Sequence, residues 1–400
     1  MQPKILWVSF YLPYPLDEGG KIRSHYLMKS MAEKYDIVLA CLIRSKEELK
    51  YLPEMQKICK EIHPILLPRS KPWEIGKFIW SLIANKPYLM ERVKSKKMQS
   101  LIDKIVREKD IDLILIDHLH MAQYVENKPV PKILDEHNVE SELVKQRYIS
   151  LPFGLVKWLT GLEHEKLYRH EKKICKKISH IIALTDEDKE KIRNLNVPTE
   201  KISVLPIGVA LEEINHNFQK KNNQILFIGA LNWPPNEEAV LYFYNEIIPF
   251  IKNEVSDITF LVAGKRPSKK LKELAEKDKN LILTGYVDDI KPLMRESSLM
   301  VVPLKSGSGM RVKILEAFSV GLPVVSTSIG CEGIEVINDE SILIADKPNE
   351  FAKKVAGLMK SKEKRNKLAI AAHKLAEAKY SWEKIYQKAD NTIESLISDK

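Results

Sequence analysis

The chain has 400 residues, 44% of them hydrophobic and 30% charged, which is the balance of a globular protein. No apolar run approaches the roughly 20 residues that a membrane-spanning helix needs. The opening MQPKILWVSF has neither the basic region nor the cleavage site of a signal peptide. The four cysteines have no metal-ligand spacing, so we expect neither disulfides nor zinc, and we predict a cytoplasmic protein.

The formal net charge of +10 suggests an anionic partner, which could be a nucleic acid, a membrane surface or a phosphorylated small molecule. No helix-turn-helix, zinc or RNA-recognition pattern accompanies the charge, so we expect no nucleic-acid partner. The length exceeds one ordinary core and predicts two domains.

The first half of the chain alternates short apolar strands with helices, and its first strand is Ile5–Phe10. Gly19 and Gly20 follow in the next loop, and a helix is expected from about Lys21 to Lys34. Strand, glycine-rich turn and helix are typical of the opening of a nucleotide-binding α/β domain. A glycine pair by itself is weak evidence, because many such pairs only make a turn. Further strands are expected at 36–42, 63–67, 112–116, 132–134, 178–184 and 201–205.

Acidic and imidazole side chains follow two of these predicted strands. Open α/β sheets bind ligands at the carboxyl ends of their strands, so two such groups in one domain indicate a site. A single histidine at a strand end is often only a hydrogen-bonded structural residue. The residues concerned are Asp117, His118 and His120 after one strand, and Asp135, Glu136, His137 and Asn138 after the next.

Two stretches, Pro72–Met98 and Tyr148–Thr160, interleave aromatic and basic residues. Such a segment can lie in a membrane interface, or it can pack its apolar side into its own domain. Both interpretations stay open, and the first would make the protein peripheral at the inner face of the plasma membrane.

The second half repeats the strand, loop and helix pattern, which predicts another parallel α/β domain. Its strands are expected at 224–228, 258–263, 281–284 and 299–303, with a helix from about Glu237 to Lys252. The predicted organisation is an N-terminal domain over 1–207, a linker over 208–223, a C-terminal domain over 224–380, and a last helix over 381–400 that crosses back to the N-terminal domain.

The most informative stretch is 306–330, SGSGMRVKILEAFSVGLPVVSTSIG, which predicts a loop, a helix, a turn and a strand. Ser306 or Ser308 could cap the helix, and Gly321 suits the left-handed position after it. A helix N-terminus is a natural anion site, and Arg311 and Lys313 add two cations there.

Glu316-Ala317 and the following run Gly321-Leu322-Pro323-Val324-Val325 resemble the signature of retaining glycosyltransferases of family four. The resemblance implies the GT-B fold, two Rossmann-like parallel-sheet domains facing across a cleft. It also implies transfer of a sugar, with retention, from a UDP- or GDP-linked donor to a glycan or lipid-linked acceptor in polysaccharide or glycolipid assembly. We expect no Asp-x-Asp pair to be held in the cleft, and therefore neither a metal nor a separate cofactor.

The resemblance also assigns roles to residues of this sequence. Glu316 would hold the ribose hydroxyls, and His120 would contact the transferred sugar, with Asp117 and His118 as rivals for that role. Arg23 and His137 would lie on the acceptor side. The remaining donor contacts would be Gly19 and Gly20 near the phosphates, Gly285, Tyr286 and Val287 at the base, and Gly307, Ser308, Gly309 and Met310 at the sugar or phosphates.

Two departures from the family pattern bear on activity. Ser308 stands where a second glutamate is expected, and Ala230 and Pro235 stand where an Arg and Lys pair is expected. Either Arg311 and Lys313 replace that pair, or donor use is impaired. The alternatives to an active transferase are a non-catalytic sugar-nucleotide-binding scaffold and a sugar-nucleotide epimerase of the same fold, against which the 306–330 stretch argues.

Overall fold

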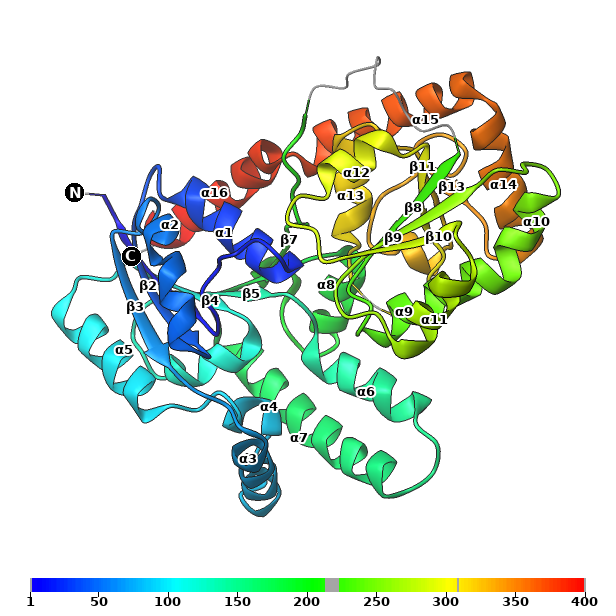
Figure 1. The fold of residues 1–400 in the computed structure, drawn as a ribbon. Helices are drawn as coiled ribbons and strands as arrows, with labels where there is room; N and C mark the ends of the chain where they lie inside the picture. The colour runs from blue at the N-terminus through cyan, green and yellow to red at the C-terminus, as the bar shows by residue number, and fades with distance from the viewer. Residues whose placement is uncertain (1, 213–222, 308, 399–400) are drawn as a thin grey trace. The chain divides into compact units, whose positions relative to one another are not determined.

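The computed structural model describes residues 2–212, 223–307 and 309–398 (Figure 1). The chain divides into two compact domains. The first comprises residues 1–207 together with 385–400, and the second comprises 208–384. Within the described residues, no helix is both long enough and apolar enough to cross a bilayer.

The first domain is built on a seven-stranded parallel sheet of order β3-β2-β1-β4-β5-β6-β7. Its central strands are almost fully buried because helices cover both faces of the sheet, which explains their continuous apolar runs. The strand order reverses between β1 and β4, and ligands bind at such switch points. The strands are β1 (Lys4–Ser9), β2 (Asp36–Ile43), β3 (Glu61–Leu66), β4 (Leu113–Asp117), β5 (Lys132–Glu136), β6 (His180–Ala183) and β7 (Ile202–Val204).

The helices of this domain explain the two aromatic and basic stretches. Residues 72–98 form most of α3, all of α4 and the start of α5. Residues 148–160 form the end of α6, the turn after it and the start of α7, and these two helices make a helical hairpin (Figure 1). Lys34 at the end of the first helix pairs with Asp390 and Glu394 of the last helix, at 3.0 Å each. The helices are α1 (Gly19–Met31), α2 (Leu52–Gln56), α3 (Lys71–Ile83), α4 (Tyr88–Glu91), α5 (Lys96–Glu108), α6 (Glu140–Ser150), α7 (Leu155–Lys177), α8 (Asp186–Arg193) and α16 (Trp382–Ser398), which begins in the second domain.

The second domain holds a six-stranded parallel sheet of order β10-β9-β8-β11-β12-β13. Its strands are β8 (Gln224–Ile228), β9 (Thr259–Ala263), β10 (Leu281–Gly285), β11 (Leu299–Val302), β12 (Val324–Ser326) and β13 (Leu343–Ile344). Its helices are α9 (Pro234–Tyr242), α10 (Ile248–Lys252), α11 (Lys269–Lys277), α12 (Lys291–Glu296), α13 (Val312–Ser319), α14 (Pro348–Lys360) and α15 (Lys362–Leu375).

The prediction of two Rossmann-like parallel-sheet domains is confirmed. The predicted helix from Glu237 to Lys252 is present, and a π-helical turn over Phe243–Ile247 joins α9 to α10 within it. Pro249, just inside α10, has no N–H to continue the preceding hydrogen-bond ladder. Most of the predicted linker lies outside the described residues.

Candidate active site

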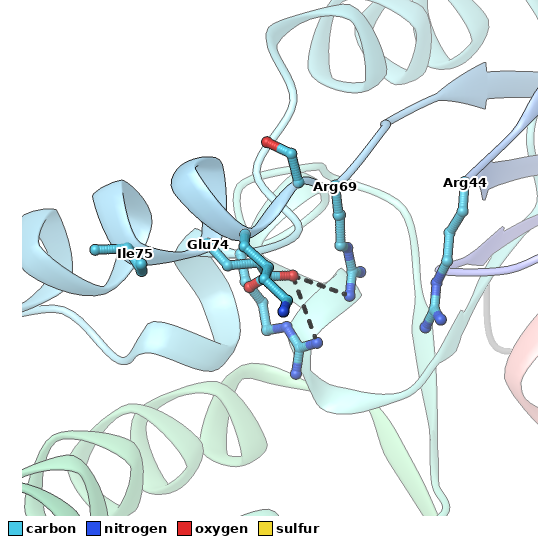
Figure 2. A pocket seen from close by; sticks show the side chains of 7 residues that line it. Arg44, Arg69, Glu74 and Ile75 are labelled. Carbon is cyan, nitrogen blue, oxygen red and sulfur yellow. Dashed lines mark ion pairs between the residues drawn. The ribbon is translucent and has the colours of Figure 1, made fainter.

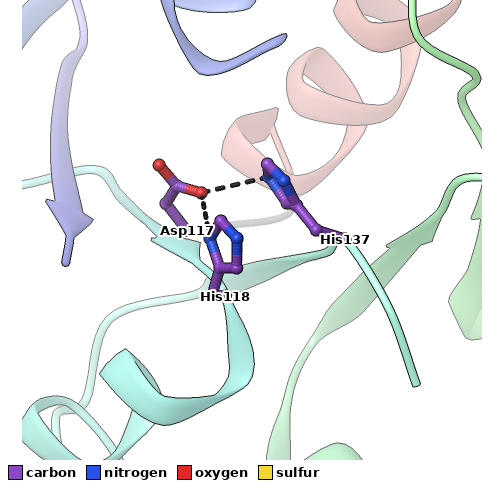
Figure 3. Close-up of side chains that lie close together, drawn as sticks. All are labelled: Asp117, His118 and His137. Atoms are coloured by element: carbon purple, nitrogen blue, oxygen red, sulfur yellow. Dashed lines mark hydrogen bonds and ion pairs between the residues drawn. The ribbon is translucent and has the colours of Figure 1, made fainter. Parts of the chain in front are cut away.

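The first group of candidate residues is a cluster of two histidines and one aspartate at the carboxyl ends of β4 and β5 (Figure 3). Asp117 ends β4, and one of its oxygens, Oδ1, lies 2.7 Å from His118 Nδ1 and 3.1 Å from His137 Nε2. His137 follows β5 and also lies 3.1 Å from Asp135 Oδ2. The sheet therefore brings together side chains that are 20 positions apart in the sequence.

The two rings of this cluster carry different charges at neutral pH. They stack with centroids 3.8 Å apart, so burial and the His137 charge both lower the pKa of His118. Burial also acts against a charged His137, but Asp135 and Asp117 outweigh it and raise the pKa of His137 to about 9. Burial likewise opposes an ionised Asp117, yet His118 and His137 hold the pKa of that carboxyl well below its usual value. A neutral imidazole thus lies against an imidazolium and a carboxylate.

The backbone near the cluster has two unusual features, a left-handed residue and a glycine packed closely against the side chains. His118 has φ of 75°, a conformation that is unfavourable for a residue with a side chain and is often kept at functional sites. Gly20, in the first turn of α1 next to Gly19, lies so near the cluster that a Cβ there would be 2.8 Å from the Tyr11 hydroxyl and 3.3 Å from His137 Nδ1. The second Asp117 oxygen accepts from the hydroxyls of Ser9 at 2.9 Å and Ser24 at 2.8 Å. No sequence pattern distinguishes these two serines.

Arg23, predicted on the acceptor side, is buried and pairs with Asp135. Its side chain is 1% exposed and forms a bidentate pair with Asp135, with Nη2 2.6 Å from Oδ1 and Nε 2.9 Å from Oδ2. Its Nη1 donates to the carbonyls of Leu205 at 2.8 Å and Pro206 at 3.0 Å. With its donors used in this way, Arg23 fixes Asp135, which in turn holds His137.

His120, the first choice for the sugar contact, does not bond with Asp117 in the described part of the chain. It is 4% exposed, its ring lies 4.4 Å from that of Phe10, and burial lowers its pKa well below the usual value. His118 is the more open of the two, with a side chain that is 11% exposed and is oriented by Asp117. His118 and His120 follow the same strand and are two positions apart, so the sequence gave no way to choose between them.

The second group of candidate residues lies in the second domain, on the loop that leads from β11 into α13. Gly307 and Gly309 have φ of 118° and 81°, which glycine adopts without strain. The helix begins at Val312 with Arg311 as its N-cap residue, so the expected cap by Ser306 is wrong. Ser308 lies outside the described residues. Gly321 has φ of 67° after the helix, as predicted.

Arg311 and Lys313 contact different partners around this loop. Arg311 Nη1 donates to the Gly309 carbonyl, so its guanidinium folds back over the glycine loop. Lys313 Nζ donates to Asn236 Oδ1 at 3.2 Å and lies 4.7 Å from the centre of the Phe227 ring. Burial, and then the Arg311 charge, lower the pKa of Lys313 to about 7. Asn236 belongs to the segment where the family's Arg and Lys pair is expected, so Lys313 places a cation there from another helix.

The remaining predicted donor contacts lie at the same edge of this sheet. Glu316 is half-buried in α13, and burial raises its pKa, while Lys291 and Lys313 act in the opposite direction. Met310 is buried beside the loop. Gly285 ends β10 with φ of 74°, the side chain of Tyr286 is 57% exposed, and Val287 follows half-buried. Tyr286 is therefore largely exposed at the predicted base position.

Both halves of the chain match families of glycosyltransferases. Residues 18–213 match "Glycosyltransferase Family 4", and residues 222–361 match "Glycosyl transferases group 1". The chain therefore belongs to the family-four, group-1 type of GT-B glycosyltransferases, and it is a glycosyltransferase.

Two curated relatives and one solved structure illustrate the similarity. An uncharacterized 44.6 kDa protein in the cps region of Klebsiella pneumoniae is 23% identical over 96% of this chain and 98% of its own length. The UDP-Gal:alpha-D-GlcNAc-diphosphoundecaprenol alpha-1,3-galactosyltransferase of Escherichia coli is 29% identical over 61% of this chain and 65% of its own. The crystal structure of Anabaena HepE in complex with UDP has a TM-score of 0.68 and 14% identity, covering 98% of this chain and all of that one.

We predict that Arg23→Met destabilises the protein, because it leaves the Asp135 carboxylate buried without its partner. Breaking a buried ion pair from one side typically costs about 3–5 kcal/mol in the free energy of unfolding, which urea denaturation would measure. Arg193→Met removes an exposed arginine of the same domain, so it is the matched control and should leave stability nearly unchanged. Wild-type stability in Arg23→Met would return Arg23 to the list of acceptor contacts.

Proposed function

We propose that this glycosyltransferase moves a sugar, with retention and without a metal, from a UDP- or GDP-linked donor to a glycan or lipid-linked acceptor. The bond between the sugar and the donor diphosphate breaks, a bond to an acceptor oxygen forms, and the acceptor's hydroxyl proton passes to the nucleoside diphosphate that leaves. The Klebsiella relative's place in a cps region and the diphosphoundecaprenol substrate of the Escherichia coli relative support a role in cell-surface polysaccharide or glycolipid assembly.

The observation that carries this proposal is the position of Lys313. Negative charge develops on the leaving diphosphate, and fixed cations and backbone donors can meet it without a metal. Lys313 lies beside Asn236, in the segment where Ala230 and Pro235 stand in place of the expected cations, and Arg311 lies over the glycine loop. The pKa of Lys313 is about 7, and an anion bound beside it would favour the charged ammonium. Glu316 on the same helix would accept from the ribose hydroxyls.

In the first domain, we infer that His118 contacts the transferred sugar and that Asp117 and His137 position it. A neutral imidazole can donate to or accept from a sugar hydroxyl through the nitrogen that Asp117 does not bond. His118, His137 and Asp117 present ligand atoms within 4.8 Å of one another and could hold a cation. A cation there would compete with the His137 proton, because Asp135 and Asp117 raise the pKa of His137 to about 9. We assign the cluster to sugar binding.

A non-catalytic scaffold is the second candidate, favoured by Ser308, Ala230 and Pro235 at positions where the family pattern has charged residues. The two candidates differ in turnover and agree in donor binding. Incubation with UDP- and GDP-sugars and a polyprenyl diphosphate-linked sugar, followed by mass spectrometry of the products, separates them. Thermal shift by the same donors without any product would favour the scaffold.

We predict that Arg311→Ala and Lys313→Ala lower turnover on the order of a hundredfold or more, as loss of a charge-stabilising donor does in other enzymes. Glu316→Ala should instead weaken donor binding and raise KM. Lys305→Ala removes an exposed lysine that precedes the same loop, so it is the matched control. If Arg311→Ala and Lys313→Ala both keep wild-type turnover while folded, these residues do not clamp the diphosphate.

For the histidine cluster, we predict that His118→Ala reduces kcat more than His120→Ala does, since Asp117 orients His118 and His118 is the less deeply buried of the two. EDTA should leave wild-type turnover unchanged. Loss of activity in EDTA that magnesium or manganese restores would contradict the metal-free proposal. A larger loss of kcat in His120→Ala would reassign the sugar contact to that residue.

We also propose that the first domain lies against an anionic membrane at the inner face of the plasma membrane. Large apolar side chains are exposed on α3 and on the α6–α7 hairpin, both of which project from the same side of this domain in Figure 1. Basic residues accompany them, including Lys77 beside Trp73 and Lys157 beside Tyr148. Exposed apolar residues between lysines suit the headgroup region of an anionic bilayer. The exposed residues are Ile75, Ile79, Trp80, Ile83, Ile149, Phe153, Leu155, Val156 and Trp158.

We predict that the protein sediments with vesicles that contain anionic lipid and much less with neutral ones. Trp80→Glu and Trp158→Glu should each weaken the binding because they place a negative charge in the apolar surface. Phe250→Glu, at an exposed position of the second domain, is the control and should bind as wild type does. Sedimentation that ignores anionic lipid and both tryptophan substitutions would exclude this surface.

A further inference from the structure

A basic cavity of about 550 Å³ opens in the first domain at the start of α3 (Figure 2). Arg44 follows β2, Arg69 precedes α3, and Arg92 follows α4, so three separate segments each bring one arginine to it. The first turns of α3 complete the lining with Ser70, Lys71, Glu74 and Ile75. The cavity lies past the carboxyl ends of β2 and β3, the edge at which parallel sheets bind ligands and at which the Asp117 cluster also lies.

Positive charge exceeds negative charge in this cavity. Among the described residues that line it, Glu74 is the only acidic one, and it pairs loosely with Arg69 at 3.8 Å and Arg92 at 3.9 Å. Figure 2 shows both pairs, whereas Arg44 makes no ion pair within the described ranges. Burial, followed by the charges of Arg92 and Arg44, lowers the pKa of Arg69 to about 10.

Two donors in the cavity wall also lack a partner. The Nε atoms of Arg69 and Arg92 are buried, and they meet no acceptor in the portion of the chain that the structure describes. A buried donor without an acceptor is costly, and like charges held together add to that cost. Guanidinium groups form charge-assisted, often bidentate hydrogen bonds with phosphate, so a phosphorylated ligand would relieve both costs.

An apolar strip leads away from the cavity along α3. Ile75 lines the cavity and is 60% exposed, and Ile79 and Ile83 follow at intervals of four residues with 51% and 74% exposure. Residues four apart share one face of a helix, so the three side chains form a continuous apolar strip. Trp80, also exposed, lies beside Ile79 in the sequence. A basic cavity joined to an apolar strip is complementary to an amphiphile with an anionic head and a hydrocarbon tail.

We propose that this cavity binds the phosphate or diphosphate group of a lipid-linked acceptor, with the first part of the lipid chain along Ile75, Ile79 and Ile83. This inference rests on the proposed function, because it names the acceptor class for the same transferase. The cavity is separate from the Arg311 and Lys313 loop, which belongs to the other domain and is assigned to the donor diphosphate. Two distinct basic sites would let the protein hold one diphosphate on the donor and another on the acceptor.

Binding of farnesyl diphosphate, inorganic pyrophosphate and farnesol to the full chain, measured by calorimetry, tests this proposal. Farnesyl diphosphate should bind most tightly, and farnesol should bind weakly or not at all. Arg44→Gln should weaken the binding of both diphosphates about tenfold or more, the expected cost of losing one charge-assisted contact. Ile79→Ser should weaken farnesyl diphosphate and leave pyrophosphate unchanged, which distinguishes a lipid head group from free diphosphate.

Two further comparisons separate a loss of binding from a general loss of charge or of folding. Arg107→Gln removes an exposed arginine of the same domain that does not line the cavity, and it should bind both diphosphates as wild type does. Arg44 makes no ion pair with any described residue, so Arg44→Gln should keep the wild-type melting temperature. Arg69→Gln would instead remove one of the two ion-pair partners of Glu74. Should Arg44→Gln nevertheless unfold, Arg44→Lys keeps the charge without the planar fork and should still weaken both diphosphates.

Two outcomes would overturn the proposal. One is farnesyl diphosphate binding that Arg44→Gln or Arg44→Lys leaves unchanged, and the other is displacement of farnesyl diphosphate by UDP, which would place it in the donor site. Sugar transfer is measured separately on the same proteins. If sugar transfer persists but no binding depends on Arg44, the cavity proposal is rejected and the proposed function stands. If binding depends on Arg44 but no UDP- or GDP-sugar is used for transfer, the proposed function is rejected and the cavity remains a site for a lipid phosphate.

Discussion

The first domain depends on a buried charge network in which Arg23 and His137 balance Asp135 and Asp117. Removing four charged groups from water is expensive, and the low dielectric of the interior repays the cost only when each charge has partners of good geometry. Arg23 meets this condition through a bidentate pair and two backbone carbonyls. The network fixes the ends of β4 and β5 relative to α1, and His118 takes its orientation from it.

The second domain uses charge in the opposite way. Arg311 folds over a loop of glycines, Lys313 bonds with Asn236, and the pKa of Lys313 falls to about 7 as a result of burial and the Arg311 charge. The site brings two cations together, whereas the Asp117 cluster is internally neutral. A neutral group suits a neutral sugar, and a pair of cations suits a diphosphate. The arginine cavity beside α3 is of the second kind, because Glu74 is the one acidic residue among its described lining.

The comparison of Arg23 with Arg44 shows why sequence position is a weak guide to the role of a cation. Arg23 lies one helical turn beyond Gly20, which made it a plausible ligand contact, yet the fold turns it inward against Asp135. Arg44, Arg69 and Arg92 gave no signal, because they are separated by loops and helices and meet only through the packing of β2, β3 and α4. Lys313 likewise occupies the place of the missing Arg and Lys pair through a contact with Asn236 that spans 77 positions.

The sequence by itself determined the two parallel-sheet domains, the strand ends that carry Asp117 and His137, and the loop and helix around Glu316, because local periodicity and turn residues specify these features. Only the tertiary structure decided the partners. It paired Asp117 with His118 and His137, left His120 against Phe10, and gathered the three arginines around one cavity. Side-chain partners depend on which strands lie next to each other and on what each helix covers. These long-range contacts produce no periodic pattern in the sequence from which they could be predicted.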